Sequence, residues 1–152
     1  MFMRPAMEAD LQAIKKIYME AFPLVERAPF SRIIKQWRSG ELDILTFREE
    51  DNSLIGFSIN ASEADLVLID YLAISPAVRG GGYGSKILDL LKAKFPDCQL
   101  VLDMEQVADT SAGNPEQRRR RLKFYERNGF HRTMVGISYF GMNLEIMVTD
   151  PP

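Results

Sequence analysis

The spacing of apolar residues divides the first half of the chain into helical segments followed by strands. Two helices and then three strands are expected, at residues 8–20, 31–37, 42–49, 53–60 and 66–75. The polar residues EEDN separate the first two of these strands, which predicts an antiparallel hairpin. The third strand, LVLIDYLAIS, is apolar almost throughout, a pattern typical of a buried central strand.

The second half of the chain repeats the helix and strand pattern. We expect a helix from the glycine cluster to about residue 95, a strand at 98–105, a helix from residue 115 to about 128, and strands at 130–135 and 142–149. Asn114 is expected to cap the second of these helices, with Gln117 completing a capping-box pattern. Gly129 is the expected C-terminal stop.

This order of elements predicts the fold class. With a first strand at the N-terminus, the order is strand, two helices, three strands, helix, strand, helix, two strands. It indicates an α+β (mixed α/β) domain with a mixed sheet and helices on its faces, because an all-parallel sheet needs an uninterrupted alternation of strand and helix. We expect residues 1–152 to form a single domain.

Composition narrows the class of protein. With 46% apolar and 26% charged residues and no run of about 18 apolar residues, the chain resembles a soluble globular domain. The lone Cys98 excludes an internal disulfide, and no secretion signal is evident, so we expect a cytoplasmic protein. A net charge of −2 gives no reason to expect nucleic acid or a membrane as partner. His131 is the sole histidine, so no metal site is expected.

A glycine cluster carries the first candidate chemistry. The segment VRGGGYGSK places Gly80, Gly81, Gly82 and Gly84 between a strand and a helix. It fits neither the Walker nor the Rossmann pattern. Bare backbone at a helix N-terminus nevertheless favours a pyrophosphate, and Arg79 adds a cation. The alternative interpretation is a tight turn with no ligand.

A second sequence segment supports a ligand-binding role for the glycine cluster. Arg79, Gly82 and Gly84 form R-x-x-G-x-G, and about forty residues later the chain contains KFYERNGF. This pair resembles the GNAT superfamily of acetyl-CoA dependent N-acetyltransferases, over nearly the whole chain from Arg4 to Val148. The chain departs from many members in having LDMEQ where they carry an asparagine at the strand end.

The resemblance implies a central mixed, mostly antiparallel sheet of about seven strands with about four helices. It also implies a splayed central strand pair that forms the coenzyme A cleft. It implies acetyl-CoA as co-substrate, bound through the residues Leu72, Ala73, Ile74, Arg79, Gly80, Gly81, Gly82, Gly84, Ser85 and Phe124. Tyr125 would protonate the departing thiolate, since a phenol with a pKa of about 10 is protonated at neutral pH. The alternative for Tyr125 is a core aromatic.

The reaction also needs a proton acceptor, because an amine with a pKa of about 10.4 is almost wholly protonated at pH 7. Asp103 and Glu105 lie two apart on a strand and so face the same side, with Glu105 at the strand end. Glu105 is the first candidate, and an exposed acid without catalytic role is the alternative. Asp70, inside an apolar strand, and Glu26 are rivals.

The arginine run at residues 118–121 is expected to be mostly solvated, because consecutive helical residues point around the whole circumference. Two partners are possible for the Arg118 side chain: a coenzyme phosphate, or Glu116 or Glu126 in an ion pair.

The predicted function is acetyl transfer to a primary amine by direct attack, with a small molecule as acceptor. Candidate pocket residues are Glu26, Phe30, Asp70 and Tyr139, with Phe22 and Phe140 nearby. A protein or peptide amine is an alternative acceptor, and a non-catalytic coenzyme A sensor or interaction module is the alternative from another class. The sequence leaves the acceptor and the oligomeric state open, a homodimer included.

Overall fold

The structure is a computed structural model that describes residues 1–107, 114–139 and 141–152. Its strands are β1 (Phe2–Pro5), β2 (Asp43–Arg48), β3 (Leu54–Glu63), β4 (Leu66–Ile74), β5 (Gln99–Glu105), β6 (Phe130–Tyr139) and β7 (Met142–Thr149). Its α-helices are α1 (Leu11–Ala21), α2 (Phe30–Arg38), α3 (Tyr83–Lys94) and α4 (Pro115–Arg127). Single 3-10 turns, η1 (Glu8–Asp10), η2 (Leu24–Glu26) and η3 (Pro76–Val78), lie in the connections.

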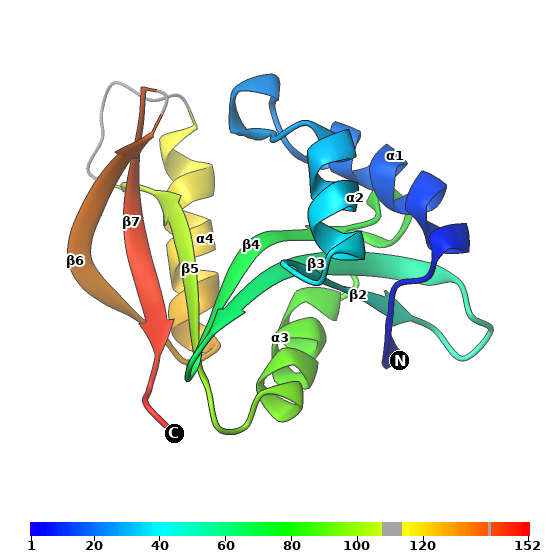
Figure 1. Cartoon of the computed structure of the whole chain (residues 1–152). Coiled ribbons are helices and arrows are strands. Elements are labelled where there is room, and N and C mark those ends of the chain that lie inside the picture. The colour runs from blue at the N-terminus through cyan, green and yellow to red at the C-terminus, as the bar shows by residue number, and fades with distance from the viewer. Residues whose placement is uncertain (108–113, 140) are drawn as a thin grey trace.

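The strands form one mixed sheet, as the sequence predicted. Their order across the sheet is β1-β2-β3-β4-β5-β7-β6. β4 and β5 run parallel, and every other neighbouring pair is antiparallel, including the predicted β2–β3 hairpin. The parallel pair therefore lies at the centre of the sheet, with helix α3 connecting its two strands (Figure 1).

Helices cover the two faces of the sheet unequally. On one face, α1 and α2 pack through Ile14, Tyr18 and Ile33 on β2, β3 and β4. On the other face, α3 packs through Ile87 and Leu91, and α4 lies behind β5 and β7 (Figure 1). Among the described residues, the core under α1 and α2 contains none from β5, β6 or β7.

This unequal cover corrects one expectation, that β4 is buried on both faces. Val67 and Ile69 are buried, but Leu66 and Leu68 are 44% and 36% exposed. These two side chains point to the face of α1 and α2, beyond the part of the sheet that those helices cover. The continuous apolar run therefore does not mean continuous burial.

The start of α4 also differs from expectation. Asn114 precedes the helix in a left-handed conformation (φ +56°), and its side chain makes no capping bond to the backbone. Its Nδ2 donates instead to Oε1 of Gln117, at 3.1 Å. The predicted capping box is therefore wrong, whereas Gly129 ends the helix with a positive φ of +89°, as expected.

Candidate active site

The central strand pair separates partway along its length. β4 and β5 are paired over Leu66–Leu68 and Gln99–Val101, and beyond these residues the two strands diverge, as expected from the resemblance (Figure 1). The opening widens toward the C-terminal ends of both strands. A bulge lies at the same point of β4, because Ile69 pairs with Asn60 and Tyr71 with Ile59, which leaves Asp70 as the extra residue.

The glycine cluster lies between the end of β4 and the first turn of α3. Gly80 and Gly82 have φ values of +85° and +75°, a backbone conformation that side chains disfavour. The first turn of α3 carries no acidic residue. Arg79 is exposed and its Nε donates to the carbonyl oxygen of Ile74 at 3.2 Å, so the arginine lies over the strand end.

Gly84 and Phe124 have a packing relationship that the sequence did not reveal. A Cβ atom on Gly84 would lie 2.8 Å from Cζ of Phe124. The absent side chain therefore lets the first turn of α3 contact α4. The structure thus brings together the two segments that carry the family resemblance, the glycine cluster and the FYE segment.

Tyr125 lies on α4, in contact with the core and near the opening. Its ring packs edge-on against Phe124 and Phe130, with centroid distances of 5.4 and 5.7 Å. Burial raises the pKa of the Tyr125 phenol, the positive charge of Arg121 opposes this, and the negative charge of Asp103 adds to it. The phenol is therefore held protonated while sensing charges from the opening.

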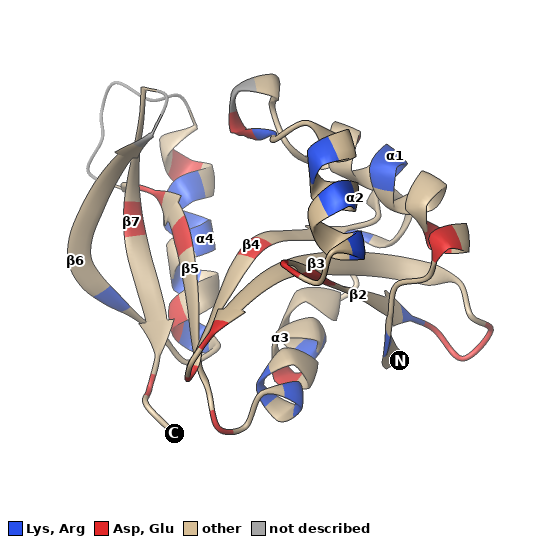
Figure 2. Ribbon diagram, viewed as in Figure 1, with Lys and Arg blue, Asp and Glu red and all other residues tan. Residues whose placement is uncertain are grey.

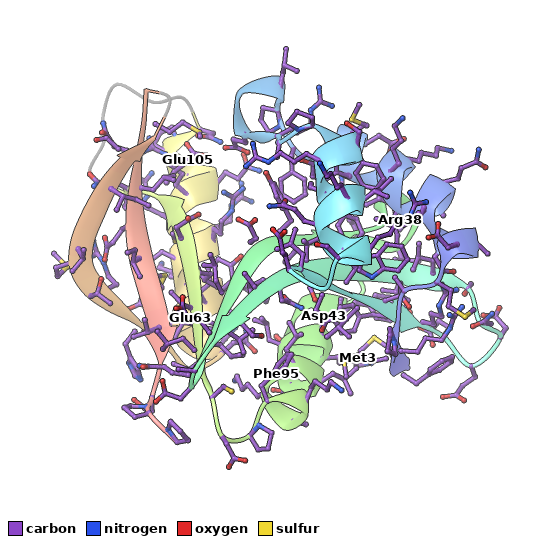
Figure 3. All side chains as sticks on the ribbon, viewed as in Figure 1. Met3, Arg38, Asp43, Glu63, Phe95 and Glu105 are labelled. Atoms are coloured by element: carbon purple, nitrogen blue, oxygen red, sulfur yellow. The ribbon has the colours of Figure 1, made fainter. Side chains whose placement is uncertain are left out.

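The acids of β5 alternate with core residues. Leu102 and Met104 point into the core under α3 and α4, so Asp103 and Glu105 share the opposite face, as expected. The Glu105 side chain is 23% exposed, and Oε1 lies 3.9 Å from Nη1 of Arg121 on α4. Figure 3 shows Glu105 at the end of β5 beside α4. Burial raises the pKa of Asp103.

Glu26 is held near the opening by a tyrosine that follows Asp70. The Tyr71 hydroxyl donates to the carbonyl oxygen of Glu26 at 2.9 Å and accepts from the amide of Ala28 at 3.0 Å. The Tyr18 hydroxyl donates to the carbonyl oxygen of Ala28 at 2.6 Å. Burial raises the pKa of Glu26, the charge of Glu105 raises it further, and Arg121 opposes the shift.

Asp70 faces the same opening from β4. Burial raises the pKa of this carboxyl, and so does the negative charge of Asp103, while Arg32 lowers it. The structure therefore brings together four acids that the sequence could only name separately. Figure 2 shows acidic positions on β4 and β5 at the opening, with basic positions along α4 beside them.

The other predicted pocket residues either pack against Tyr18 and Tyr71 or lie outside the described part of the structure. Phe30 is a core residue, 7% exposed, whose ring centroid lies 5.3 Å from that of Tyr18. Phe22 packs edge-on against Tyr71 at 5.0 Å. Tyr139 contributes backbone to β6, and its side chain lies outside the described part of the structure, as does the whole of Phe140.

The arginine run is only partly solvated. Arg119 and Arg120 are exposed as expected, but Arg118 is 1% exposed and its Nη1 donates to the carbonyl oxygen of Gln106 at 2.5 Å. The expectation of a solvent-facing or phosphate-facing Arg118 is therefore wrong. This arginine instead attaches the start of α4 to the residue that follows β5, next to Glu105.

Sequence reasoning missed two residues of this region, Tyr71 and Arg121. A signal for Arg121 was present, because it lies four residues before Tyr125 and hence on the same helix face. No sequence signal marked Tyr71, whose hydroxyl partners lie more than forty residues away.

The described residues contain neither a candidate metal centre nor a candidate membrane-spanning helix. No group of three or more His, Cys, Asp or Glu residues among them could hold a metal ion. None of the described helices combines the length and apolar character that crossing a membrane requires.

Comparison with known proteins identifies the class. The model of the acetyltransferase (GNAT) domain matches residues 43–132, more than half of the chain. The chain therefore belongs to the GNAT acetyltransferase family. No curated protein matches it.

Solved structures of low sequence identity share the fold. A protein assigned to the GNAT acetyltransferases of Bacteroides thetaiotaomicron superposes with a TM-score of 0.82 at 22% identity, covering 100% of this chain and 88% of that one. A mutant of the spermidine N-acetyltransferase SpeG of Vibrio cholerae gives 0.71 at 14% identity, covering 98% and 94%. A protein described as a phosphinothricin N-acetyltransferase gives 0.72 at 18% identity, covering 99% and 98%.

Proposed function

We propose that this protein transfers an acetyl group from acetyl-CoA to the primary amine of a small molecule, by direct attack in a ternary complex. The observation that carries the proposal is the opening between β4 and β5, which has a glycine-rich helix N-terminus at its edge and Tyr125, Glu105 and Glu26 around it. Membership of the GNAT acetyltransferase family supports the reaction class.

The glycine segment fits the pyrophosphate of coenzyme A. Gly80 and Gly82 present backbone without side chains, and a Cβ on either would meet nothing within 4 Å, so the space in front of them is open. The first amides of α3 and its dipole favour an anion, and no carboxylate in that turn opposes one. Arg79 and Ser85 complete this set, and the diverging edge of β4 at Leu72, Ala73 and Ile74 offers backbone groups to the pantetheine arm.

When bound, the coenzyme supplies an acetyl thioester, and the residues of the chain manage the protons. Tyr125 returns a proton to the departing sulfur, and its raised pKa keeps the phenol protonated at neutral pH. Glu105 accepts the proton of the attacking amine, with Glu26 close enough to feel its charge. Arg121 contacts Glu105 and affects the pKa values of both Glu26 and Tyr125, so it couples the two sides of the reaction.

Direct attack is favoured over a covalent acetyl-enzyme. Cys98 immediately precedes β5, whereas Glu105 ends that strand. Seven residues of extended chain span about 23 Å, so this thiol is far from the opening. A second nucleophile of comparable reactivity does not line the opening among the described residues.

The acceptor is proposed to be a small molecule, because named neighbours of the same fold act on small amines. Structural neighbours include an enzyme named for spermidine and one named for phosphinothricin, both small amines.

The test is free-thiol release from acetyl-CoA with a panel of diamines, amino acids, aminoglycosides and peptide N-termini. Acetyl-CoA binding is measured separately by calorimetry. We expect turnover with at least one small amine, and initial-velocity lines that intersect when both substrates are varied. Parallel lines would contradict direct attack.

Cofactor binding without turnover of any amine would instead support the sensor alternative. Turnover confined to peptides would support a protein acceptor. Absence of acetyl-CoA binding would overturn the proposal and leave the glycines as a turn only.

A further inference from the structure

Two acids face each other where β4 and β5 separate. Leu68 and Val101 are the last paired residues of the two strands, and Asp70 and Asp103 each lie two positions further along. Residues two apart on a strand share a face, and the bulge at Asp70 turns this residue and Tyr71 to the face of α1 and α2. Both carboxylates therefore flank the narrow end of the opening, and both remain exposed to a ligand.

The charges around this point are unbalanced. Each of the four carboxyls of Glu26, Asp70, Asp103 and Glu105 either raises the pKa of another member of the group or has its own raised. Two guanidinium groups lower pKa values in the group, Arg32 acting on Asp70 and Arg121 acting on Glu26. Arg121 is also the ion-pair partner of Glu105. No ion pair of 4.0 Å or less joins Asp70 or Asp103 to another described residue, so a cation bound between them relieves their repulsion.

An independent observation indicates that this is where a ligand binds. Tyr125 is half-buried against Phe124 and Phe130, and its hydroxyl makes no hydrogen bond to a described residue. Its phenol nevertheless senses Asp103 and Arg121, so it is directed at the same opening. A half-buried hydroxyl without a hydrogen-bond partner among the described residues, next to accessible acids, is suited to a substrate that supplies the partner.

We propose that the acceptor amine carries a second cationic group, which Asp70 and Asp103 bind while the reacting nitrogen lies near Tyr125 and Glu105. This inference rests on the proposed function, and it narrows the acceptor to linear diamines and polyamines. Asp103 and Glu105 are about 7 Å apart along the strand, roughly the distance between the nitrogens of a four-carbon diamine.

The experiment compares 1,4-diaminobutane with butylamine, which has the same carbon chain and one charge fewer. We expect kcat/KM for the diamine to exceed that for the monoamine by more than tenfold, well beyond the factor of two from its two equivalent amines. Asp70→Asn and Asp103→Asn should each reduce this ratio at least fivefold. Calorimetry with 1,4-diaminobutane alone should show the same loss of affinity without any turnover.

Glu63→Gln is the matched control. Glu63 ends β3 at the end of the sheet opposite Glu105 (Figure 3). The substitution therefore removes the same charge as Asp70→Asn, but outside the opening. Its ratio should equal that of the wild type. An equal ratio in Glu63→Gln and in Asp70→Asn would mean that Asp70 contributes no more than a remote charge, and would overturn the inference.

Failure of the inference is distinguishable from failure of the proposed function. If kcat/KM for butylamine and other monoamines equals that for the diamine, the protein is an N-acetyltransferase, but the proposal of a second cationic group in the acceptor is wrong. If no amine is acetylated, the proposed function fails, yet binding of 1,4-diaminobutane that Asp70→Asn abolishes would still support a dication site.

Discussion

The two sides of the β4–β5 opening differ in charge. On the side of α3, bare glycine backbone and a helix N-terminus without acids form a surface suited to an anion. On the side of α1 and α2, Glu26, Asp70, Asp103 and Glu105 form a surface suited to a cation. Under the proposed function, the anionic coenzyme and the cationic amine are each attracted to one side of the sheet and repelled from the other.

The alternation of strand residues makes this separation possible within a single strand. On β5, Leu102 and Met104 enter the core under α3 and α4, and Asp103 and Glu105 project to the other face. Where β4 and β5 diverge, Tyr125 on α4 is close enough for the charge of Asp103, which projects to the other face, to affect its pKa. Four predictions test the division of roles.

The largest effect is expected from Tyr125→Phe. The phenylalanine keeps the packing against Phe124 and Phe130 but cannot donate a proton, so kcat should fall about 100-fold, the lower end of the range for a lost general acid. Affinity for acetyl-CoA, measured by calorimetry, should be unchanged. Because burial raises the pKa of this phenol above its ordinary value near 10, the defect should be constant from pH 6 to 9. A fall in kcat of less than threefold would mean that Tyr125 is only a core aromatic.

The next largest effect is expected when a negative charge is introduced on the α3 side of the opening. Gly80→Asp places a carboxylate beside the proposed pyrophosphate site, at a position with open space around it. Gly80→Asn is the control, because both residues tolerate a positive φ and have nearly the same shape. We expect the aspartate variant to bind acetyl-CoA about tenfold more weakly than the asparagine variant, which corresponds to about 1.4 kcal/mol. Equal dissociation constants would move the pyrophosphate away from the glycine cluster.

Tyr71→Phe tests the side of α1 and α2. It removes the hydroxyl that connects Glu26 and Ala28 to β4, so the free energy of unfolding should fall by about 1 kcal/mol in urea titrations. KM for the amine should rise several-fold, while the affinity for acetyl-CoA stays constant. An equal loss for both substrates would show that η2 supports the whole fold and not the acceptor side alone.

The smallest effect concerns stability against pH. Folding raises the pKa values of Asp70 and Asp103, so the folded state resists their ionisation. The stabilisation from the protonated forms is present below their ordinary pKa near 3.9 and is lost as pH rises through the folded-state values. Asp70→Asn and Asp103→Asn should therefore raise the melting temperature at pH 7 by about 1–2 °C, and the gain should shrink toward pH 4. Destabilised variants at pH 7 would mean that these acids have cationic protein partners.

Local pattern was sufficient for most of the fold, because periodicity and turn residues depend on near neighbours in the chain. It predicted the β2–β3 hairpin, the helix ending before Gly129, and the shared face of Asp103 and Glu105. It failed for Arg118, since burial of an arginine depends on a carbonyl group twelve positions earlier. It failed for the cap at Asn114 because the backbone there adopts a left-handed conformation.

The sequence by itself determined the order of elements, the glycine cluster, the FYE segment and the family that they indicate, because these follow from residue identity and spacing. Only the tertiary structure decided which charges meet. Asp70, Asp103, Glu105 and Glu26 come from β4, β5 and η2, and they converge because the strands part after Leu68 and Val101 and because Tyr71 fixes η2 above them. Electrostatic interactions act through space, so their strength depends on distances that the order of residues along the chain does not contain.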